Sequence, residues 1–258
     1  MNLDLNTKTV RELALEMPAT TRVFESLKID YCCGGRKPIA EAAESAGVDL
    51  STLSKMLENV FNGGTVDADS VAPEKLDPSN LIDHIVSKHH LYTRDELVRL
   101  MPLAEKVRDR HGDHHPELFE LQSIFQTLSD ELLVHMRKEE AVLFPFIKQM
   151  QLAADGLFPA YPPHFGTVQN PVRMMMMEHD AAGDMLKKMR ELTADYTLPE
   201  GACPSYTALF HGIQELEKDL HQHIHLENNV LFDQAVELET KVFGSGNVAA
   251  ESCCGAGK

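Results

Sequence analysis

Two ten-residue segments of the chain repeat one pattern of polar and apolar residues. They read HMRKEEAVLF from His135 and HIHLENNVLF from His223, and each places a histidine four residues before a glutamate, Glu139 or Glu227. Residues four apart share one face of a helix, and this face also carries apolar residues, namely Leu128, Leu132, Val142 and Phe146 in the first copy and Leu216, Leu220 and Val230 in the second. A buried carboxylate is costly unless it pairs with a cation or binds a metal ion. The pattern therefore predicts metal binding in a helical core.

Two further histidines extend the duplication. The segments HHLYTRDEL and EHDAAGDML align His90 with His179, together with the apolar residues around them. His90 precedes His135 by 45 residues and His179 precedes His223 by 44, whereas His84 would give an offset of 51. The matching offsets favour His90 over His84 as the inward histidine of its helix.

Four inward histidines and two glutamates can hold two metal ions, with each carboxylate able to bridge. Mixed nitrogen and oxygen donors suit iron, and the order His-x-x-x-Glu differs from the Glu-x-x-His of ferritin-like sites, which favours a hemerythrin-like bundle. A single histidine on an apolar face is more often a hydrogen-bonded core residue, but the duplicated set favours metal. The predicted ligands are His90, His135, Glu139, His179, His223 and Glu227. The other histidines are assigned to the surface, to loops or to the surroundings of the site, namely His84, His89, His111, His114, His115, His164, His211, His221 and His225.

Long helices are needed to position these residues. Four helical segments with loops rich in proline and glycine between them predict an all-α, up-down-up-down bundle, and they span roughly 79–110, 115–151, 172–196 and 204–240. Before them, Thr9 and Glu12 form a capping box that starts a small helical domain. The predicted organisation is a helical domain at 1–62, a linker at 63–78, the bundle at 79–242 and a flexible tail at 243–258.

Composition narrows the classes of partner. With 24 basic and 40 acidic residues among 258, the formal net charge of -16 opposes binding to nucleic acid and to anionic membranes. The sequence has no uncharged apolar run of the ~18 residues that a membrane span needs, and its start lacks a signal-peptide pattern. We therefore expect a cytoplasmic protein with neither nucleic acid nor membrane as partner. The oligomeric state stays open, with a homodimer as one option.

The segment DYCCGG, residues 30–35, joins two adjacent thiols, Cys32 and Cys33, to two glycines. A helix-forming sequence, KPIAEAAESAG, follows directly, and a helix N-terminus lowers the pKa of a nearby thiol. A buried structural pair in a tight turn is the alternative. Five cysteines in this clustering are too few for a disulfide framework. A second pair, Cys253 and Cys254, lies in the predicted tail, where it could bind metal, regulate or have no role.

With DYCCGG near its start and both His-x-x-x-Glu segments in the bundle, the chain resembles the di-iron proteins that repair iron–sulfur clusters, over nearly its whole length. The resemblance implies a hemerythrin-like bundle with two non-haem iron ions, an oxo bridge between them being one option. It also implies induction by nitric oxide or oxidative stress, damaged iron–sulfur proteins as partners, the same six ligands, and a role for Cys32 and Cys33. Supply of iron and enzymatic reduction of nitric oxide or peroxide both stay open, and a reversible oxygen carrier fits least well.

Overall fold

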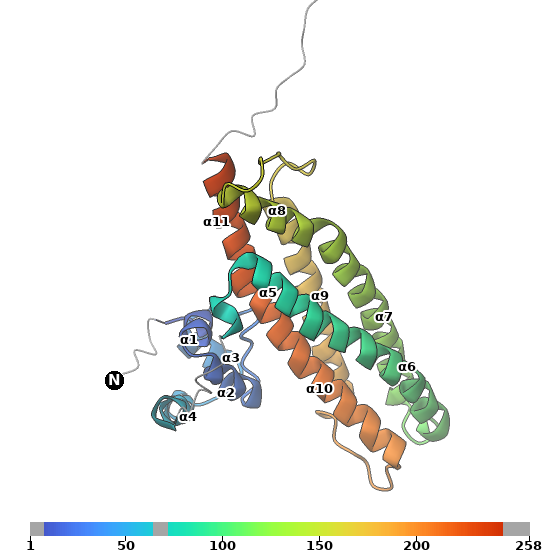
Figure 1. Cartoon of the computed structure of the whole chain (residues 1–258). Coiled ribbons are helices and arrows are strands. Elements are labelled where there is room, and N and C mark those ends of the chain that lie inside the picture. Colours follow the sequence, from blue (N-terminus) through green and yellow to red (C-terminus); the bar gives the residue numbers. More distant parts are fainter. Residues whose placement is uncertain (1–7, 64–71, 245–258) are drawn as a thin grey trace, which may run out of the picture.

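The structure is a computed structural model that describes residues 8–63 and 72–244. In these two ranges the chain is helical apart from its loops and one isolated backbone bridge between Thr9 and Pro38. A long helical bundle carries a smaller helical domain on one side (Figure 1). The all-α fold predicted from the sequence is thereby confirmed, with a four-helix bundle preceded by a small helical domain.

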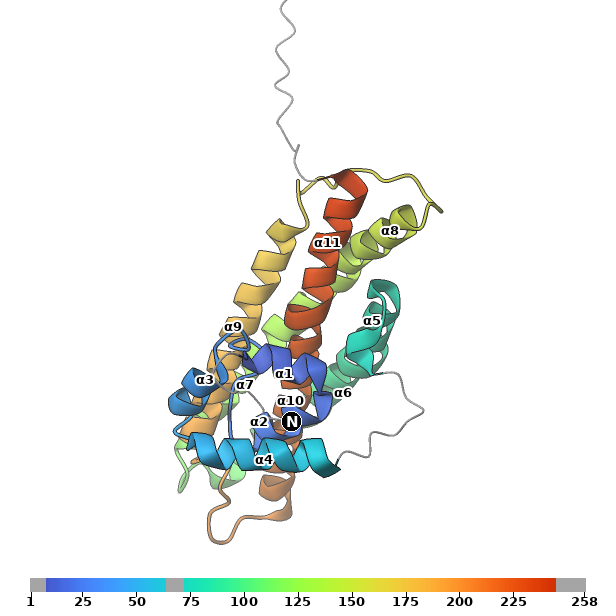
Figure 2. The same cartoon turned by 90° about the vertical axis from the view of Figure 1, so that its left-hand side faces the viewer.

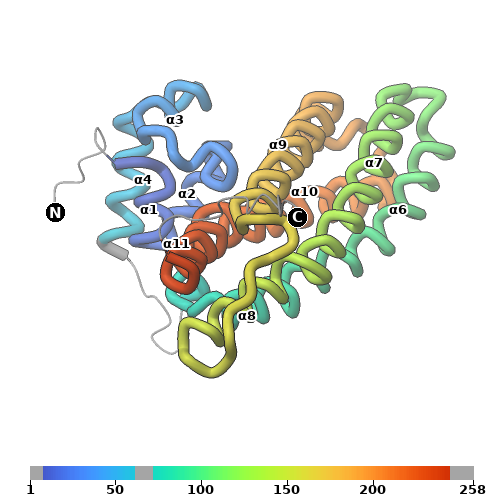
Figure 3. The backbone as a smooth tube through the Cα atoms, turned by 90° about the horizontal axis from the view of Figure 1, so that it is seen from above, coloured from blue at the N-terminus to red at the C-terminus, as the bar shows by residue number. Residues whose placement is uncertain are grey.

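Four helical arms form the bundle. Their parts, in chain order, are α5 (Pro78–His84), η3 (Ile85–His90) and α6 (Leu91–His111); α7 (Glu117–Lys138), η4 (Glu139–Leu143) and α8 (Phe144–Ala154); α9 (Gln169–Leu192); and α10 (Pro204–Leu226), η5 (Glu227–Leu231) and α11 (Phe232–Phe243). Helix α6 packs against α7 and α10, and α7 packs against α9, which gives the arrangement seen from above in Figure 3. Within the described ranges, the helices all fall short of the length and apolarity that crossing a membrane requires.

Three of the four arms contain a π-helical turn at or beside the predicted ligands. The turn η3 ends at His90, while η4 and η5 begin at Glu139 and Glu227. Such turns are wider than α-helical ones and are frequent at functional sites. The wider turn η4 moves the inward stripe of its arm by one residue. Val142, which was predicted to face the core, is therefore 40% exposed, and Leu143 is buried in its place.

Two apolar clusters fill the bundle, one on each side of the predicted ligands. The first surrounds Phe125 and joins α6, α7, α9 and α10, and the second surrounds Ile147 and joins α5, α8, α9 and α11. The predicted ligands form a polar layer between these clusters. Full burial of a large apolar side chain contributes about 1.5–3 kcal/mol, so the two clusters provide the main favourable contribution to folding of the bundle.

The N-terminal helices enclose a third apolar cluster of their own. The predicted capping box is present, because the Thr9 hydroxyl accepts from the Glu12 amide and the Glu12 carboxylate accepts from the Thr9 amide. Gly47 follows α3 with a φ of +68°, a conformation that favours glycine and ends helices. The elements are α1 (Val10–Glu16), η1 (Pro18–Thr20), α2 (Thr21–Ser26), α3 (Ile39–Ser45), α4 (Leu50–Gly63) and, after the gap, η2 (Pro73–Lys75).

Polar contacts hold the N-terminal domain against α10, η5 and α11 (Figure 2). The Arg11 guanidinium donates to the carbonyl oxygen of Asn229 at 2.7 Å and also pairs with Asp233. His221 Nδ1 on α10 lies 2.9 Å from the carboxylate of Glu25 on α2. The segment DYCCGG lies at this junction, so the cysteine pair and the polar layer of the bundle are close neighbours.

Candidate metal centre

Six side chains from the four arms meet in the polar layer between the two apolar clusters. All six are buried, and the two glutamates are fully inaccessible to solvent. The structure brings together every residue that the duplicated pattern selects: His90 from η3, His135 from α7, Glu139 from η4, His179 from α9, His223 from α10 and Glu227 from η5.

The six side chains fall into two groups of four that share both glutamates. We call these groups the His90–His223 position and the His135–His179 position, and both include Glu139 and Glu227. Within each group, the four possible donor atoms lie within 4.8 Å of one another. The paired Nε2 atoms face each other across 3.1 Å in the first position and 3.0 Å in the second. Each group could therefore hold a metal ion.

Both carboxylates lie between the two positions. Glu227 Oε1 is 3.0 Å from His223 Nε2, and its Oε2 is 3.2 Å from His179 Nε2. Glu139 Oε2 lies 3.4 Å from the Nε2 atoms of both His90 and His135. A carboxylate placed in this way can bridge two ions, and the mixed nitrogen and oxygen set suits a metal such as iron.

Hydrogen bonds from Nδ1 orient three of the four histidines. Each partner offers an oxygen to Nδ1, so Nδ1 is the donor and Nε2 is the atom directed at the centre, where it can bind a metal ion after losing any proton that it carries. Residues that hold metal-binding histidines in this way also raise their basicity. The three pairs are His90 with Glu140 at 2.6 Å, His135 with Glu178 at 2.8 Å, and His179 with the Asn228 side-chain oxygen at 2.8 Å.

Several buried polar atoms of this layer have no hydrogen-bond partner in the part of the chain that the structure describes. They are both carboxylate oxygens of Glu139, one of Glu227, and Nδ1 of His223. Burial lowers the pKa of His90, but the neighbouring carboxylates outweigh burial and raise it to about 10. The same opposition raises the pKa of His179 to about 9. The carboxylates thus attract positive charge, and the donor set fits a pair of bound cations.

Other histidines near the layer lie outside these groups. Neither His84 nor His225 belongs to either four-residue group found among the described residues. His225 is buried, with Nδ1 3.3 Å from the carbonyl oxygen of Tyr31. His89 is buried as well, and its ring stacks on that of His223 at a centroid distance of 5.6 Å. These histidines surround the centre rather than enter it.

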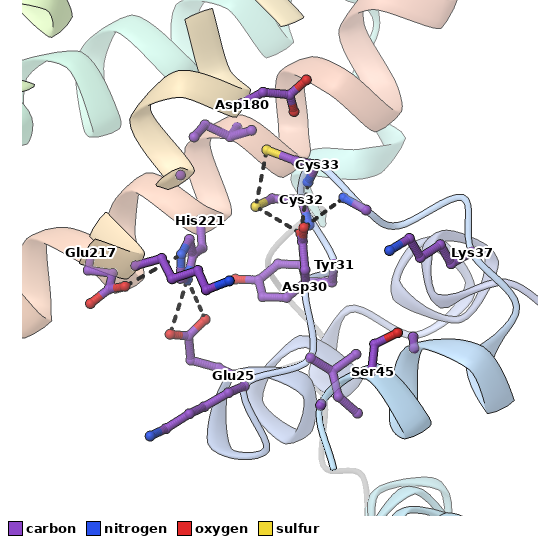
Figure 4. A pocket seen from close by; sticks show the side chains of 18 of the residues that line it. Glu25, Asp30, Tyr31, Cys32, Cys33, Lys37, Ser45, Asp180, Glu217 and His221 are labelled. Atoms are coloured by element: carbon purple, nitrogen blue, oxygen red, sulfur yellow. Dashed lines mark hydrogen bonds and ion pairs between the residues drawn. The ribbon is translucent and has the colours of Figure 1, made fainter. Parts of the chain in front are cut away.

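The cysteine segment folds into a tight loop clamped by Asp30. The Asp30 carboxylate accepts hydrogen bonds from the backbone amides of Cys32, Cys33 and Gly34 at 3.1, 2.9 and 2.9 Å. The two thiol sulfurs are 3.7 Å apart, and with Asp30 they form a third group that could hold a metal ion. The loop lines a cavity of about 590 Å³ between the N-terminal domain and the bundle, and Asp180 of α9 lines it from the other side (Figure 4).

This loop does not place the thiols at a helix N-terminus. Helix α3 begins only at Ile39. The neighbouring Cys33 thiol, burial and the Asp30 carboxylate together raise the pKa of Cys32. The expectation of a lowered thiol pKa is therefore wrong for Cys32. Both cysteines of the predicted tail, and residues 64–71 of the predicted linker, lie outside the described residues.

Sequence reasoning missed the three residues that orient the histidines. Each is adjacent in sequence to a predicted ligand: Glu140 and Asn228 follow the two shared glutamates, and Glu178 precedes His179. The repeat could have pointed to two of these residues, because Glu140 and Asn228 are polar and occupy equivalent places in its two copies.

Known proteins share both parts of this chain. Residues 81–235 match the hemerythrin HHE cation binding domain, and residues 6–60 match a domain of unknown function, DUF542. The iron-sulfur cluster repair protein YtfE of Yersinia pseudotuberculosis is 35% identical over 238 residues, which cover 92% of this chain and 100% of that protein. The protein of the same name from Yersinia pestis is 34% identical over the same shares of both chains. The chain therefore belongs to the family of iron–sulfur cluster repair proteins that join a DUF542 domain to a hemerythrin HHE domain.

Proposed function

We propose that the protein repairs damaged iron–sulfur clusters by supplying iron from a di-iron centre in its bundle. The observation that carries this proposal is the pair of buried four-donor groups that share Glu139 and Glu227. The match to a cation binding domain supports a bound metal, and the names of the relatives, which are iron-sulfur cluster repair proteins, support clusters as the recipients of iron.

In this proposal each position holds one iron ion. Two imidazoles and two shared carboxylates form each donor set. A non-haem iron with so few protein donors keeps open coordination sites, at which a small ligand can bind and through which the ion can be lost. A pair of bound irons supplies two-electron redox chemistry as well as exchangeable iron. Glu140, Glu178 and Asn228 hold three of the histidines in place, so the empty positions stay ready for new ions.

The thiols of Cys32 and Cys33 form the second part of the proposal. They receive iron from the bundle or contact the damaged protein, and sulfur donors are common iron ligands. The raised pKa of Cys32 keeps this thiol protonated until an incoming metal ion displaces the proton. Both thiols line the cavity between the domains, and Cys33, which is only partly buried, is the more accessible of the two to a partner.

Assays on one iron-loaded sample can distinguish the supply of iron to damaged clusters from enzymatic turnover of nitric oxide or peroxide. We expect it to reactivate an enzyme whose iron–sulfur cluster nitric oxide has damaged, and to lose its own iron in proportion, with iron-free protein as the control. Consumption of nitric oxide or peroxide without reactivation would instead assign the centre to a di-iron enzyme. Both assays use the same sample, so differences in loading cannot explain the outcome.

We predict about two irons per chain, because two four-donor positions lie in the core of a four-helix bundle. Anaerobic loading with ferrous iron, followed by elemental analysis and a visible absorption spectrum, measures this number. A single zinc ion per chain after such loading, without charge-transfer absorption, would contradict the di-iron proposal.

A further inference from the structure

The cysteine loop docks on the π-helical turn that carries one of the shared glutamates. Asn229 of η5 donates through Nδ2 to the carbonyl oxygens of Tyr31 and Cys32, both at 3.2 Å. Nearby on α10, His225 Nδ1 lies 3.3 Å from the same Tyr31 oxygen. These contacts are buried, so the backbone of the loop is fixed relative to η5.

Asn228, the neighbour of Asn229, connects this loop to a predicted metal ligand. Its Nδ2 donates to the Cys32 carbonyl oxygen at 3.3 Å, and its Oδ1 accepts from His179 Nδ1 at 2.8 Å. On the other side of that ring, His179 Nε2 faces His135 Nε2 at 3.0 Å. One amide side chain therefore spans from the backbone of the cysteine loop to the His135–His179 position.

The other two orienting residues bond only within the bundle, as far as the described residues show. Glu140 accepts from its histidine and from Arg94, and Glu178 accepts from its histidine and from Lys138. Glu140 is the counterpart of Asn228 in the repeat. The duplicated arrangement is thus broken at this place, where the N-terminal domain docks. It differs at a second place as well, because Nδ1 of His223 has no hydrogen-bond partner among the described residues, and His89 stands in the repeat where the other half has Glu178.

From this asymmetry we propose that Asn228 is a positioning residue that couples the cysteine loop to the His135–His179 position and leaves the His90–His223 position uncoupled. The inference rests on the proposed function, since it takes these positions to hold iron. When iron or a client protein engages the thiols, the Cys32 carbonyl moves, Asn228 follows, and the hydrogen bond that orients His179 weakens. Loss of such a bond lowers metal affinity by about 10–100-fold, so the coupled position releases its ion first.

An amide is suited to this place because it donates from nitrogen and accepts at oxygen, whereas a carboxylate only accepts. Aspartate at position 228 would still accept from His179 but would direct a second acceptor at the Cys32 carbonyl. Glu140 has donors as both partners and needs no amide. The difference between the two copies of the repeat therefore matches the difference in their surroundings.

A double-mutant cycle in full-length, iron-loaded protein tests the coupling. Asn229→Ala loosens the loop without removing a contact to a metal ligand, and Asn228→Asp removes the donor to Cys32 while keeping the acceptor for His179. The measured quantity is the rate at which each iron passes to a ferrous chelator. We expect Asn229→Ala to speed one kinetic phase by about tenfold, but by less than about twofold in the Asn228→Asp background.

Glu140→Gln is the matched control. It is expected to speed the other phase, because Glu140 orients His90, and to leave the effect of Asn229→Ala in place. Mössbauer spectra of the same samples assign the phases, since a changed histidine alters the signal of one iron only. Asp30→Ala, which frees three backbone amides of the loop, is a second loosening variant in case Asn229→Ala does not fold.

Equal effects of Asn229→Ala in both backgrounds would overturn the coupling, and so would equal acceleration of both irons. The release assay uses no damaged cluster, so its result does not depend on repair. Protein that shows the coupling and repairs no cluster would refute the proposed function alone, whereas protein that repairs clusters without the coupling would refute this inference alone.

Discussion

Replacing Glu139 with alanine is expected to lower bound iron from about two ions per chain to well below one. The Glu139 carboxylate lies 3.4 Å from one histidine of each position, so its removal takes a donor from both. By contrast, His135→Ala and His223→Ala each take a donor from a single position and are expected to leave about one iron per chain. Elemental analysis after anaerobic loading measures the difference.

His84→Ala is the matched control, because His84 belongs to the same bundle but lies outside both four-residue groups. This variant is expected to keep its iron. Metal-free Glu139→Ala is expected to keep the fold of the metal-free parent, because the two apolar clusters that hold the arms together do not include Glu139. Thermal unfolding followed by circular dichroism thus separates loss of metal from loss of fold. Full iron in Glu139→Ala, or an empty site in His84→Ala, would show that the ligands are assigned wrongly.

Replacing Cys32 and Cys33 together with serine is expected to abolish repair while leaving the iron content and the iron spectrum unchanged. The thiols are not among the six bundle donors, and Asp30 clamps the loop through backbone amides that serine retains. The substitution replaces each thiol with a hydroxyl, which is a much poorer ligand for iron than the sulfur donor that the proposal requires. Reactivation of a damaged cluster enzyme and an absorption spectrum, both on one sample, test the expectation.

Two controls accompany this variant. Cys203→Ser alters a free thiol at the start of α10, away from the cysteine loop, and is expected to leave repair intact. Serine at Cys253 and Cys254 is expected to matter less than the change in DYCCGG. Full repair by the doubly substituted loop would reduce its thiols to a structural role. Loss of repair on removing the tail pair, with the loop variant still active, would move the working thiols to the C-terminus.

The duplication made the predicted ligand set readable from the sequence. One histidine on an apolar stripe has several explanations, but two copies in the same arrangement leave few. Offsets that differ by only one residue, 45 and 44, selected His90 over His84, and the structure places His90 with the other five side chains. The four arms were readable for a related reason, because long helices repeat their apolar periodicity many times.

Local geometry and contacts between domains explain what the sequence did not show. Val142 faces solvent because η4 is wider than the regular turn that the spacing argument assumes. The pKa of Cys32 is raised because the folded-back loop places this thiol beside the Cys33 thiol, buries it, and brings it to the Asp30 carboxylate. Asn228 could not be recognised as a link, because only tertiary packing brings it to a residue 196 positions away.

The two apolar clusters on either side of the ligand layer also separate metal binding from folding. In small zinc domains the free energy of binding the ion is folding free energy, so the chain unfolds when the ion leaves. Here the clusters around Phe125 and Ile147 hold the four arms together whether or not the layer between them is filled. If the protein supplies iron as proposed, it therefore does not need to unfold when the iron leaves, and one chain could be emptied and refilled repeatedly.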